Sequence, residues 1–363
     1  MSLNQRNHRR FLECFLKNSF FPTRSISFML AILFFLASLL LTSSYLHAQD
    51  QSQFLYAATV SGYDYSGGAS LSGAGVYRSN LQFADWQRVS WTHLPARALT
   101  VLEDEGPPAL LLGSDDGILR PFQNSSGWKI LTDWRVRDVL DLVVDPFQPE
   151  MVYAATGLGI FISHDAGATW SSGNRGLKDT FVSCLLPDPQ MPGRVLAGTE
   201  AGLFESSDYG QSWKPLALEG IAIRALLRQP ISPGIFWVGT EYHGLINSPD
   251  GGYVFTPVAL ADDSLSIYSL AGGNPGEPIV AGSFERGLFM ATEDDPLWRH
   301  LEGSEQFGTV FSIVMFESGQ KMYFGTQSNG VWRTTDGGAN WEAFGLTGAD
   351  VRKLITVTRE QSP

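Results

Sequence analysis

The chain is poor in charge, in cysteine and in basic residues. Only 17% of its 363 residues are charged, and 25 Lys and Arg face 37 Asp and Glu, giving a net charge of -12. Because nucleic-acid binding depends on a positive surface, this balance argues against a nucleic-acid partner. Two cysteines, Cys14 and Cys184, are too few for a disulfide scaffold. A hydrophobic content of 44% nevertheless allows a sizeable core, which excludes a disordered or fibrous chain.

One apolar run stands near the N-terminus. Residues 28–41 are apolar except for Ser38, several Lys and Arg precede them, and Leu46-His47-Ala48 follows. This pattern predicts a signal peptide over residues 1–48 and export to a periplasmic, lumenal or extracellular space. The run is shorter than the roughly 20 residues of a membrane span, but residues 26–46 could form an N-terminal anchor if cleavage failed.

An aromatic residue recurs along the rest of the chain with spacings of 42 or 43 residues. Eleven residues before each aromatic stands a glycine followed by an aliphatic residue, and two apolar runs precede that glycine. Each unit therefore holds four short strands separated by turns, which is typical of a β-propeller blade. The seven aromatics are Trp86, Trp128, Trp170, Trp213, Phe255, Trp298 and Trp341.

Four of the seven units carry a shared motif between the third and fourth strands. It reads Ser/Thr-x-Asp-x-Gly, followed by the aromatic five residues after the aspartate. An aspartate there can accept hydrogen bonds from turn amides, the glycine can adopt positive φ, and the aromatic can anchor the fourth strand. The motif residues are Asp165, Gly167 and Trp170; Asp208, Gly210 and Trp213; Asp250, Gly252 and Phe255; Asp336, Gly338 and Trp341.

These segments resemble the Asp-box, or BNR, repeat. The resemblance implies a structural hairpin at the propeller periphery. No box offers the several oxygen ligands of a calcium loop, so we expect no metal and no cofactor. A WD40 propeller is excluded because the chain lacks a Trp-Asp dipeptide.

The two ends of the repeat region predict how the ring closes. Residues 54–59 match a second strand, and residues 351–357, after the last aromatic, match the missing first strand. We therefore predict an all-β, seven-bladed propeller with four antiparallel strands per blade, closed by the C-terminal strand. Residues 49–363 form this single domain, which we expect to be monomeric.

The face opposite the boxes holds the candidate binding residues. The position near the start of each inner strand is assigned to Arg352, Arg97, Arg137, Ser183, Arg224, Tyr268 and Ser312 in ring order. Three arginines on consecutive blades would form a positive crescent at the channel mouth, suited to a carboxylate or phosphate. Alternatively, they pair with acids on neighbouring turns such as Asp115, Glu200 and Glu241.

Two further features extend this face. Trp134 and Arg135 lie on a link between blades, and the long turn after Thr59 is rich in glycine, serine and tyrosine, including Tyr63 and Tyr65. Such a composition is found in binding loops, although a tolerated surface insertion explains it equally well.

Catalytic signatures are scarce. The histidines are scattered without metal-ligand spacing, and no phosphate loop, zinc signature or nucleophile elbow is present. Sialidases with Asp boxes use an arginine triad and a tyrosine–glutamate nucleophile. By resemblance to them, Tyr268 is a candidate catalytic residue. Xyloglucanase-like hydrolases place their catalytic carboxylates between two propellers, whereas this chain predicts one.

Over its whole length the repeat region resembles the Ycf48/Hcf136-like photosystem II stability and assembly factors. That resemblance implies an exported, non-catalytic propeller whose arginine-rich patch engages a client protein, by position Arg352, Arg97, Arg137 and Arg224. We therefore expect a protein-binding or assembly platform with an anionic partner. A membrane contact is expected only through the N-terminal segment, and a sialidase-like or xyloglucanase-like glycoside hydrolase is the alternative.

Overall fold

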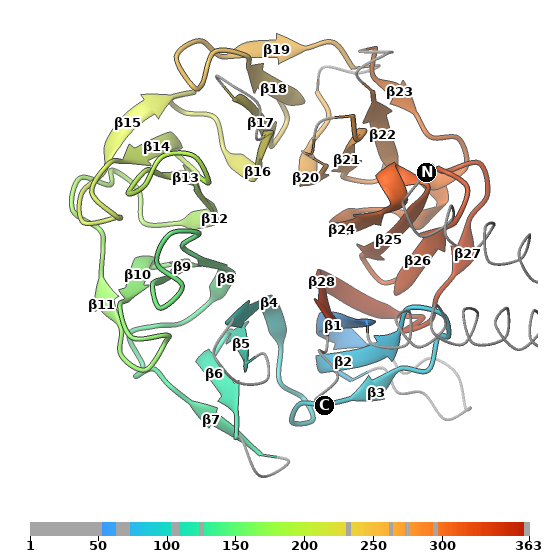
Figure 1. Cartoon of the computed structure of the whole chain (residues 1–363), viewed down its shortest axis with the longest axis horizontal. Coiled ribbons are helices and arrows are strands. Elements are labelled where there is room, and N and C mark those ends of the chain that lie inside the picture. Colours follow the sequence, from blue (N-terminus) through green and yellow to red (C-terminus); the bar gives the residue numbers. More distant parts are fainter. Residues whose placement is uncertain are drawn as a thin grey trace, which may run out of the picture. The chain divides into compact units, whose positions relative to one another are not determined.

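The computed structural model confirms seven four-stranded antiparallel sheets arranged around a central channel (Figure 1). It describes residues 53–62, 73–102, 109–122, 127–229, 234–260, 264–272, 274, 276–292 and 297–358. All of them belong to the unit Ser52–Pro363. The predicted signal segment, residues 1–48, and the loop tyrosines Tyr63 and Tyr65 lie outside the described residues. No helix in the described ranges is long and apolar enough to span a membrane.

Blade 1 consists of β28, β1, β2 and β3, and each later blade takes four consecutive strands in chain order. The inner strands are β28 (Ala349–Thr358), β4 (Ala96–Leu102), β8 (Val139–Val144), β12 (Val182–Pro187), β16 (Ile223–Gln229), β20 (Ile267–Ala271) and β24 (Val310–Phe316). The second strands are β1 (Gln53–Gly62), β5 (Ala109–Ser114), β9 (Val152–Thr156), β13 (Val195–Thr199), β17 (Ile235–Thr240), β21 (Ile279–Ser283) and β25 (Lys321–Thr326). The third strands are β2 (Gly75–Asn80), β6 (Gly117–Pro121), β10 (Gly159–Ser163), β14 (Gly202–Ser206), β18 (Leu245–Ser248), β22 (Leu288–Ala291) and β26 (Val331–Thr334). The outer strands are β3 (Gln87–Arg88), β7 (Trp128–Ile130), β11 (Ser171–Ser172), β15 (Lys214–Ala217), β19 (Thr256–Val258), β23 (Arg299–His300) and β27 (Glu342–Ala343). The described residues also include two 3-10 turns: η1 (Ser304–Phe307) lies between β23 and β24, and η2 (Glu317–Gly319) lies between β24 and β25.

The ring is closed as predicted, because β28 pairs antiparallel with β1 from Gln53↔Thr358 to Gly62↔Ala349. The C-terminal strand thus supplies the inner strand of the blade that the N-terminal strand begins. Side chains of β28 are buried between blades 1 and 7, including Val351 and Leu354. Closure also covers the edge of β1, on which another strand could otherwise pair.

Adjacent blades pack closely because the second strands carry small residues. In β13, a Cβ on Gly198 would lie 2.7 Å from Ile223 Cγ2 in the next blade and 2.6 Å from Cys184 Sγ. No side chain fits at such a distance, so the glycine here sets the spacing between blades. The same Gly-Thr or Gly-Ser step recurs near the end of most second strands.

The four Asp boxes form one hydrogen-bonding pattern. In blade 3, Asp165 Oδ1 accepts from the backbone N of Thr169 at 2.7 Å, and Ser163 Oγ accepts from Gly167 N at 2.8 Å. The backbone N of Ala166 then donates to the carbonyl of Glu150, in the turn between the first and second strands of the same blade. The boxes therefore tie two turns together on one face of the propeller, which we call the box face. The opposite face is the link face, since it carries the connections between blades.

The box aromatics anchor the outer strands to different depths. Trp213 is buried, whereas Trp170, Phe255 and Trp341 are half-buried. The indole of Trp213 donates to the carbonyl of Gly173 in the preceding blade at 2.7 Å, and that of Trp341 donates to Glu302 at 2.9 Å. Trp86 makes the equivalent bond to Phe344 across the closure between blades 1 and 7. The repeated tryptophans thus fasten neighbouring blades as well as filling their own.

Blade 1 contains a box that sequence comparison missed. Ser79 Oγ donates to Asp85 Oδ1 at 2.9 Å, and the backbone N of Asn80 donates to the same oxygen at 3.0 Å. In this blade the aspartate stands directly before Trp86, at the position where the box consensus has a small hydroxyl residue. The hydrogen bond between a hydroxyl and a carboxylate is retained although the aspartate occupies a different position, and the turn keeps the length of the other boxes.

The Asp boxes predict an acid-dependent loss of stability. Hydrogen bonds from Asn340 and Thr334 lower the pKa of Asp336 from 3.8 to about 2. A carboxylate whose pKa is depressed on folding stabilises the folded state above its unfolded pKa, and that contribution disappears as the pH falls from 3.8 to about 2. We expect Asp336→Ala to lower the melting temperature at neutral pH and to differ less from the wild type below that window. A difference that stays constant across the same pH range, measured by calorimetry, would exclude a charge-dependent role for the box.

Candidate functional site

The channel mouth on the link face is formed by one residue from each inner strand. In every inner strand the pairing with the second strand skips one residue, which is the register shift of a β-bulge. All seven skipped residues line a cavity of about 490 Å³. They are Arg352, Arg97, Leu140, Ser183, Arg224, Tyr268 and Phe311.

Two of the predicted equivalences are corrected by this register. Blade 3 presents Leu140 and not Arg137, and blade 7 presents Phe311 and not Ser312. Arg137 lies on the exposed link before β8 and makes no ion pair with the residues that the structure describes. A signal for the correct register was present in the sequence. A buried apolar residue, such as Val139 or Val310, stands directly before each bulge.

The arginines at the mouth are paired with acids of the link face. Arg97 bonds Asp115 through Nε and through Nη2, the latter at 3.3 Å. The guanidinium of Arg352 bonds Asp350, with Nη2 to Oδ2 at 3.3 Å. The predicted row of three arginines is thus broken by Leu140. The charges of Arg97 and Arg352 are partly neutralised by their aspartate partners.

Arg224 is the most completely neutralised of them. It bonds Glu200 at 2.7 Å, Ser183 Oγ at 3.0 Å and, from Nη2, Glu241. Although burial opposes its charged form, these two carboxylates raise the pKa of Arg224. Few donors of Arg224 remain for a ligand, so it serves mainly to join blades 4 and 5.

Arg352 is the least satisfied cation of the cavity. Its guanidinium carbon lies 3.8 Å from the centre of the Phe311 ring, and its Nε atom is buried without a hydrogen-bond partner in the described residues. Burial lowers the pKa of Arg352; the carboxylate of Asp350 opposes this shift, whereas the positive charge of Arg97 adds to it. Two like charges on neighbouring blades therefore line the same cavity, and each forms an ion pair with one carboxylate of the described residues.

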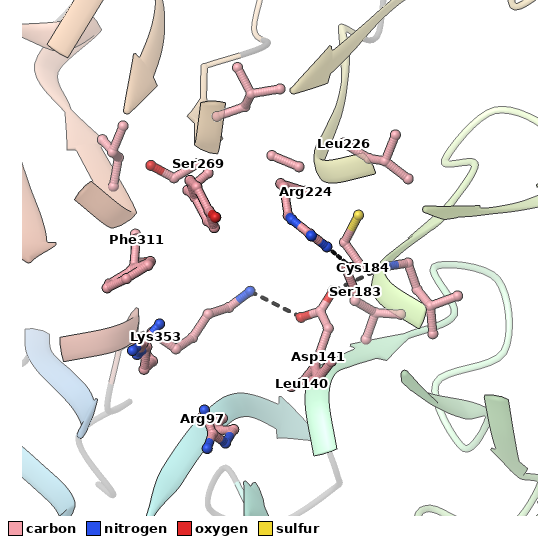
Figure 2. A pocket seen from close by; sticks show the side chains of 18 of the residues that line it. Arg97, Leu140, Asp141, Ser183, Cys184, Arg224, Leu226, Ser269, Phe311 and Lys353 are labelled. Atoms are coloured by element: carbon pink, nitrogen blue, oxygen red, sulfur yellow. Dashed lines mark hydrogen bonds and ion pairs between the residues drawn. The ribbon is translucent and has the colours of Figure 1, made fainter. Parts of the chain in front are cut away.

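An ion pair that sequence analysis missed crosses the channel. Figure 2 shows Lys353 of β28 extending toward Asp141 of β8, with Nζ to Oδ1 at 3.3 Å. The same carboxylate accepts from the backbone N of Leu185 at 3.2 Å. Asp141 thus connects three blades: blade 3, blade 4 and, through Lys353, the closing strand of blade 1. Both residues occupy the position after the bulge, where other inner strands carry small residues such as Ala98 or Ser269.

Two potentially reactive groups line the same cavity. Cys184 is buried, and burial together with the negative charge of Asp141 raises the pKa of its thiol well above the usual range. The thiolate is therefore disfavoured, as expected of a cysteine that acts as a small apolar residue. The hydroxyl of Tyr268 donates to Glu241 Oε1 at 3.3 Å, and burial followed by the charge of Glu241 raises the pKa of Tyr268.

No group of three or more His, Cys, Asp or Glu within the described ranges is arranged to hold a metal ion. The acids of the cavity are instead held by cations and backbone amides. The available chemistry is that of hydrogen-bond donors, guanidinium groups and aromatic faces.

Exposed apolar side chains lie on the connections of the link face. Trp134 is 80% exposed on the link between β7 and β8, and Phe181, 39% exposed, also lines the cavity. Arg135 pairs with Asp133 on the same link as Trp134. The other large exposed apolar residues on connections of this face are Trp91, Leu158, Tyr242 and Phe284.

Comparisons with known proteins identify the fold. No family model matches the chain, and no curated protein matches it. Among solved structures, the GH74 xyloglucanase from Xanthomonas campestris is 20% identical, with a TM-score of 0.54, covering 68% of this chain and 45% of that one. The extracellular domain of the one-component system BT4673 from B. thetaiotaomicron is 15% identical, with a TM-score of 0.53, covering 80% and 46%. YCF48 from Cyanidioschyzon merolae is 14% identical, with a TM-score of 0.51, covering 68% and 84%.

The chain therefore spans less than half the length of the xyloglucanase and of the sensor domain. At such identities the similarity establishes a shared propeller architecture and nothing closer. The chain is a seven-bladed β-propeller with distant structural similarity to Ycf48, to GH74 xyloglucanases and to a BT4673-type sensor domain.

Proposed function

We propose that the propeller is an exported, non-catalytic binding platform that holds a carboxylate- or phosphate-bearing protein partner at the channel mouth. The observation that carries this proposal is Arg352, whose buried Nε has no hydrogen-bond partner in the described part of the chain, while Arg97 adds a second positive charge to the same cavity. An anion placed between the two guanidinium groups would relieve their repulsion and satisfy that donor.

The ion pairs of the other cavity cations indicate where in the cavity an anion can bind. Arg224 is already held by Glu200 and Glu241, and Lys353 is held by Asp141. The anion is therefore expected on the side of blades 1 and 2, beside Phe311, rather than at the centre of the channel. YCF48, a propeller of similar extent, supports a platform role by analogy of fold alone.

Citrate, a small polycarboxylate, tests this proposal. Ligands that bind only the folded state raise its melting temperature, so citrate at constant ionic strength is expected to stabilise the wild type. Arg352→Gln and Arg97→Gln should each abolish most of that shift, because each removes one of the two charges. Arg135→Gln is the matched control, since Arg135 lies on an exposed link and pairs with Asp133. An equal citrate shift in all four proteins, or no shift in the wild type, would contradict the proposed anion site.

A hydrolase is the second candidate, and the Tyr268–Glu241 hydrogen bond is the observation in its favour. Glycoside hydrolysis requires one carboxyl group that donates a proton and a second nucleophile or base. Here Glu241 and Glu200 share Arg224, and Asp141 is bonded to Lys353, so each of these cavity acids already has a cationic partner. Turnover of a sialoside or of xyloglucan that disappears in Tyr268→Phe would favour this candidate over the platform.

A further inference from the structure

Three exposed apolar side chains lie on neighbouring connections of the link face, and one of them lines the cavity. Trp134 lies on the link between blades 2 and 3, Leu158 on the turn between β9 and β10, and Phe181 on the link between blades 3 and 4. We define these three residues as the apolar strip. Phe181 belongs to both the strip and the cavity lining, so the two surfaces are continuous.

The connections that carry the strip pack against one another. Gly157, next to Leu158, donates its backbone N to the carbonyl of Asp138 at 3.2 Å. A Cβ on Gly157 would lie 3.5 Å from Asp138 Cβ and 3.8 Å from the Phe181 ring. The turn with Leu158 is thus in contact with the link that follows Trp134 and with the aromatic ring of Phe181.

Both aromatic residues of the strip are held on rigid turns. Asp133 accepts from the backbone N of Arg135 at 3.0 Å and from its Nη2 at 2.5 Å, which fixes the turn that displays Trp134. Asp179 accepts from the backbone N of Phe181 at 2.9 Å. A turn whose backbone is held in this way loses little entropy on binding, and tryptophan is among the residues enriched at the energetic centres of protein interfaces.

We propose that a polypeptide segment of the partner lies on the apolar strip, with apolar side chains against Trp134, Leu158 and Phe181, and with a carboxylate in the cavity near Arg352. This inference rests on the proposed function and adds where the partner chain runs. Two observations favour a polypeptide over a glycan: the strip combines an aliphatic residue with aromatic ones, and Phe181 lines the same cavity as Arg352, whose Nε has no hydrogen-bond partner in the described residues. A segment with both apolar and acidic side chains matches this combination.

Selection of peptides from a random phage library on the immobilised full chain tests the inference. We expect enrichment of sequences that combine apolar residues with aspartate or glutamate. Their affinity should fall about tenfold or more in Trp134→Ala and in Phe181→Ala, as expected for removal of an interface anchor. Tyr253→Ala is the matched control, because Tyr253 is 88% exposed on the box face, and it should leave binding unchanged. Trp134→Ala and Tyr253→Ala should melt at the wild-type temperature, since both side chains are at least 80% exposed, and the affinity of Phe181→Ala is compared at a temperature where its melt shows that it is folded.

The outcomes separate this inference from the proposed function. Peptides that lose binding in Arg352→Gln but not in the two strip variants would overturn the strip and leave the anion site standing. Peptides that lose binding in the strip variants but not in Arg352→Gln would support the strip and contradict the anion site. No enrichment above background on the wild type would overturn the inference, as would binding of a neutral glycan array or of phosphatidylglycerol vesicles that depends on Trp134.

Discussion

Removal of residues 349–363 is expected to abolish cooperative unfolding. The deletion takes away β28, the inner strand of blade 1, and with it the buried side chains of Ala349, Val351 and Leu354. It also exposes the edge of β1 along its whole length and leaves blades 1 and 7 without their shared core. A single propeller sheet cannot bury its own faces, so the loss of one inner strand should prevent the ring from forming rather than lower its stability slightly.

Thermal unfolding followed by near-UV circular dichroism measures this effect. The truncated chain should show no cooperative transition, and a synthetic peptide of residues 349–363 added in trans should restore one. Lys353→Met, which keeps the strand but removes its ion pair with Asp141, is the control and should retain a cooperative melt. A truncated chain that melts like the wild type would refute closure by the C-terminal strand.

Asp188→Ala is expected to cause the largest loss of stability among single substitutions of charged residues. Asp188 is 1% exposed and bonds Arg228 and Arg194, both of which are buried. Both guanidinium carbons lie near the ring of Phe236, that of Arg194 at 5.0 Å from the ring centre and that of Arg228 at 5.2 Å. Removing the shared carboxylate breaks a buried ion pair with each arginine, although Arg194 keeps a second carboxylate partner, Glu205, so we expect a loss of about 3–5 kcal/mol.

Urea unfolding at neutral pH measures the loss, and two controls define its cause. Lys178→Ala removes an exposed ion pair with Glu219 and should leave the midpoint of unfolding unchanged. The double variant Asp188→Leu with Arg228→Met removes a charge of each sign and should recover part of the stability lost by the single variant. A midpoint for Asp188→Ala equal to that of Lys178→Ala would show that the buried cluster contributes little.

The fold could be predicted from the sequence because it depends on local, repeated patterns. The constant interval between aromatics such as Trp128 and Trp170 fixed the blade length, and the strand-like residues 351–357 beyond the last aromatic identified the closing strand. Both patterns depend only on which residues are apolar and how far apart they stand.

The candidate site was less predictable because it depends on register and on the reach of long side chains. A β-bulge displaces a single residue, so counting along the chain assigned Ser312 to a position that Phe311 occupies, and it placed Arg137 three residues before the bulge at Leu140. The ion pair between Lys353 and Asp141 could not be predicted either. The two residues are 212 positions apart in the sequence, and the closed ring brings them together. The exposure of Trp134 depends on the turn fixed by Asp133, which composition alone does not reveal.

Photocrosslinking in the cells that produce the protein tests the platform proposal most directly. A benzoylphenylalanine in place of Phe284 would probe the link face outside the apolar strip, and one in place of Tyr253 would probe the box face. We expect a discrete protein adduct from position 284 that is lost when Arg352→Gln is added, and none from position 253. Adducts from the box face alone, or a link-face adduct that is indifferent to Arg352, would contradict a partner held at the channel mouth.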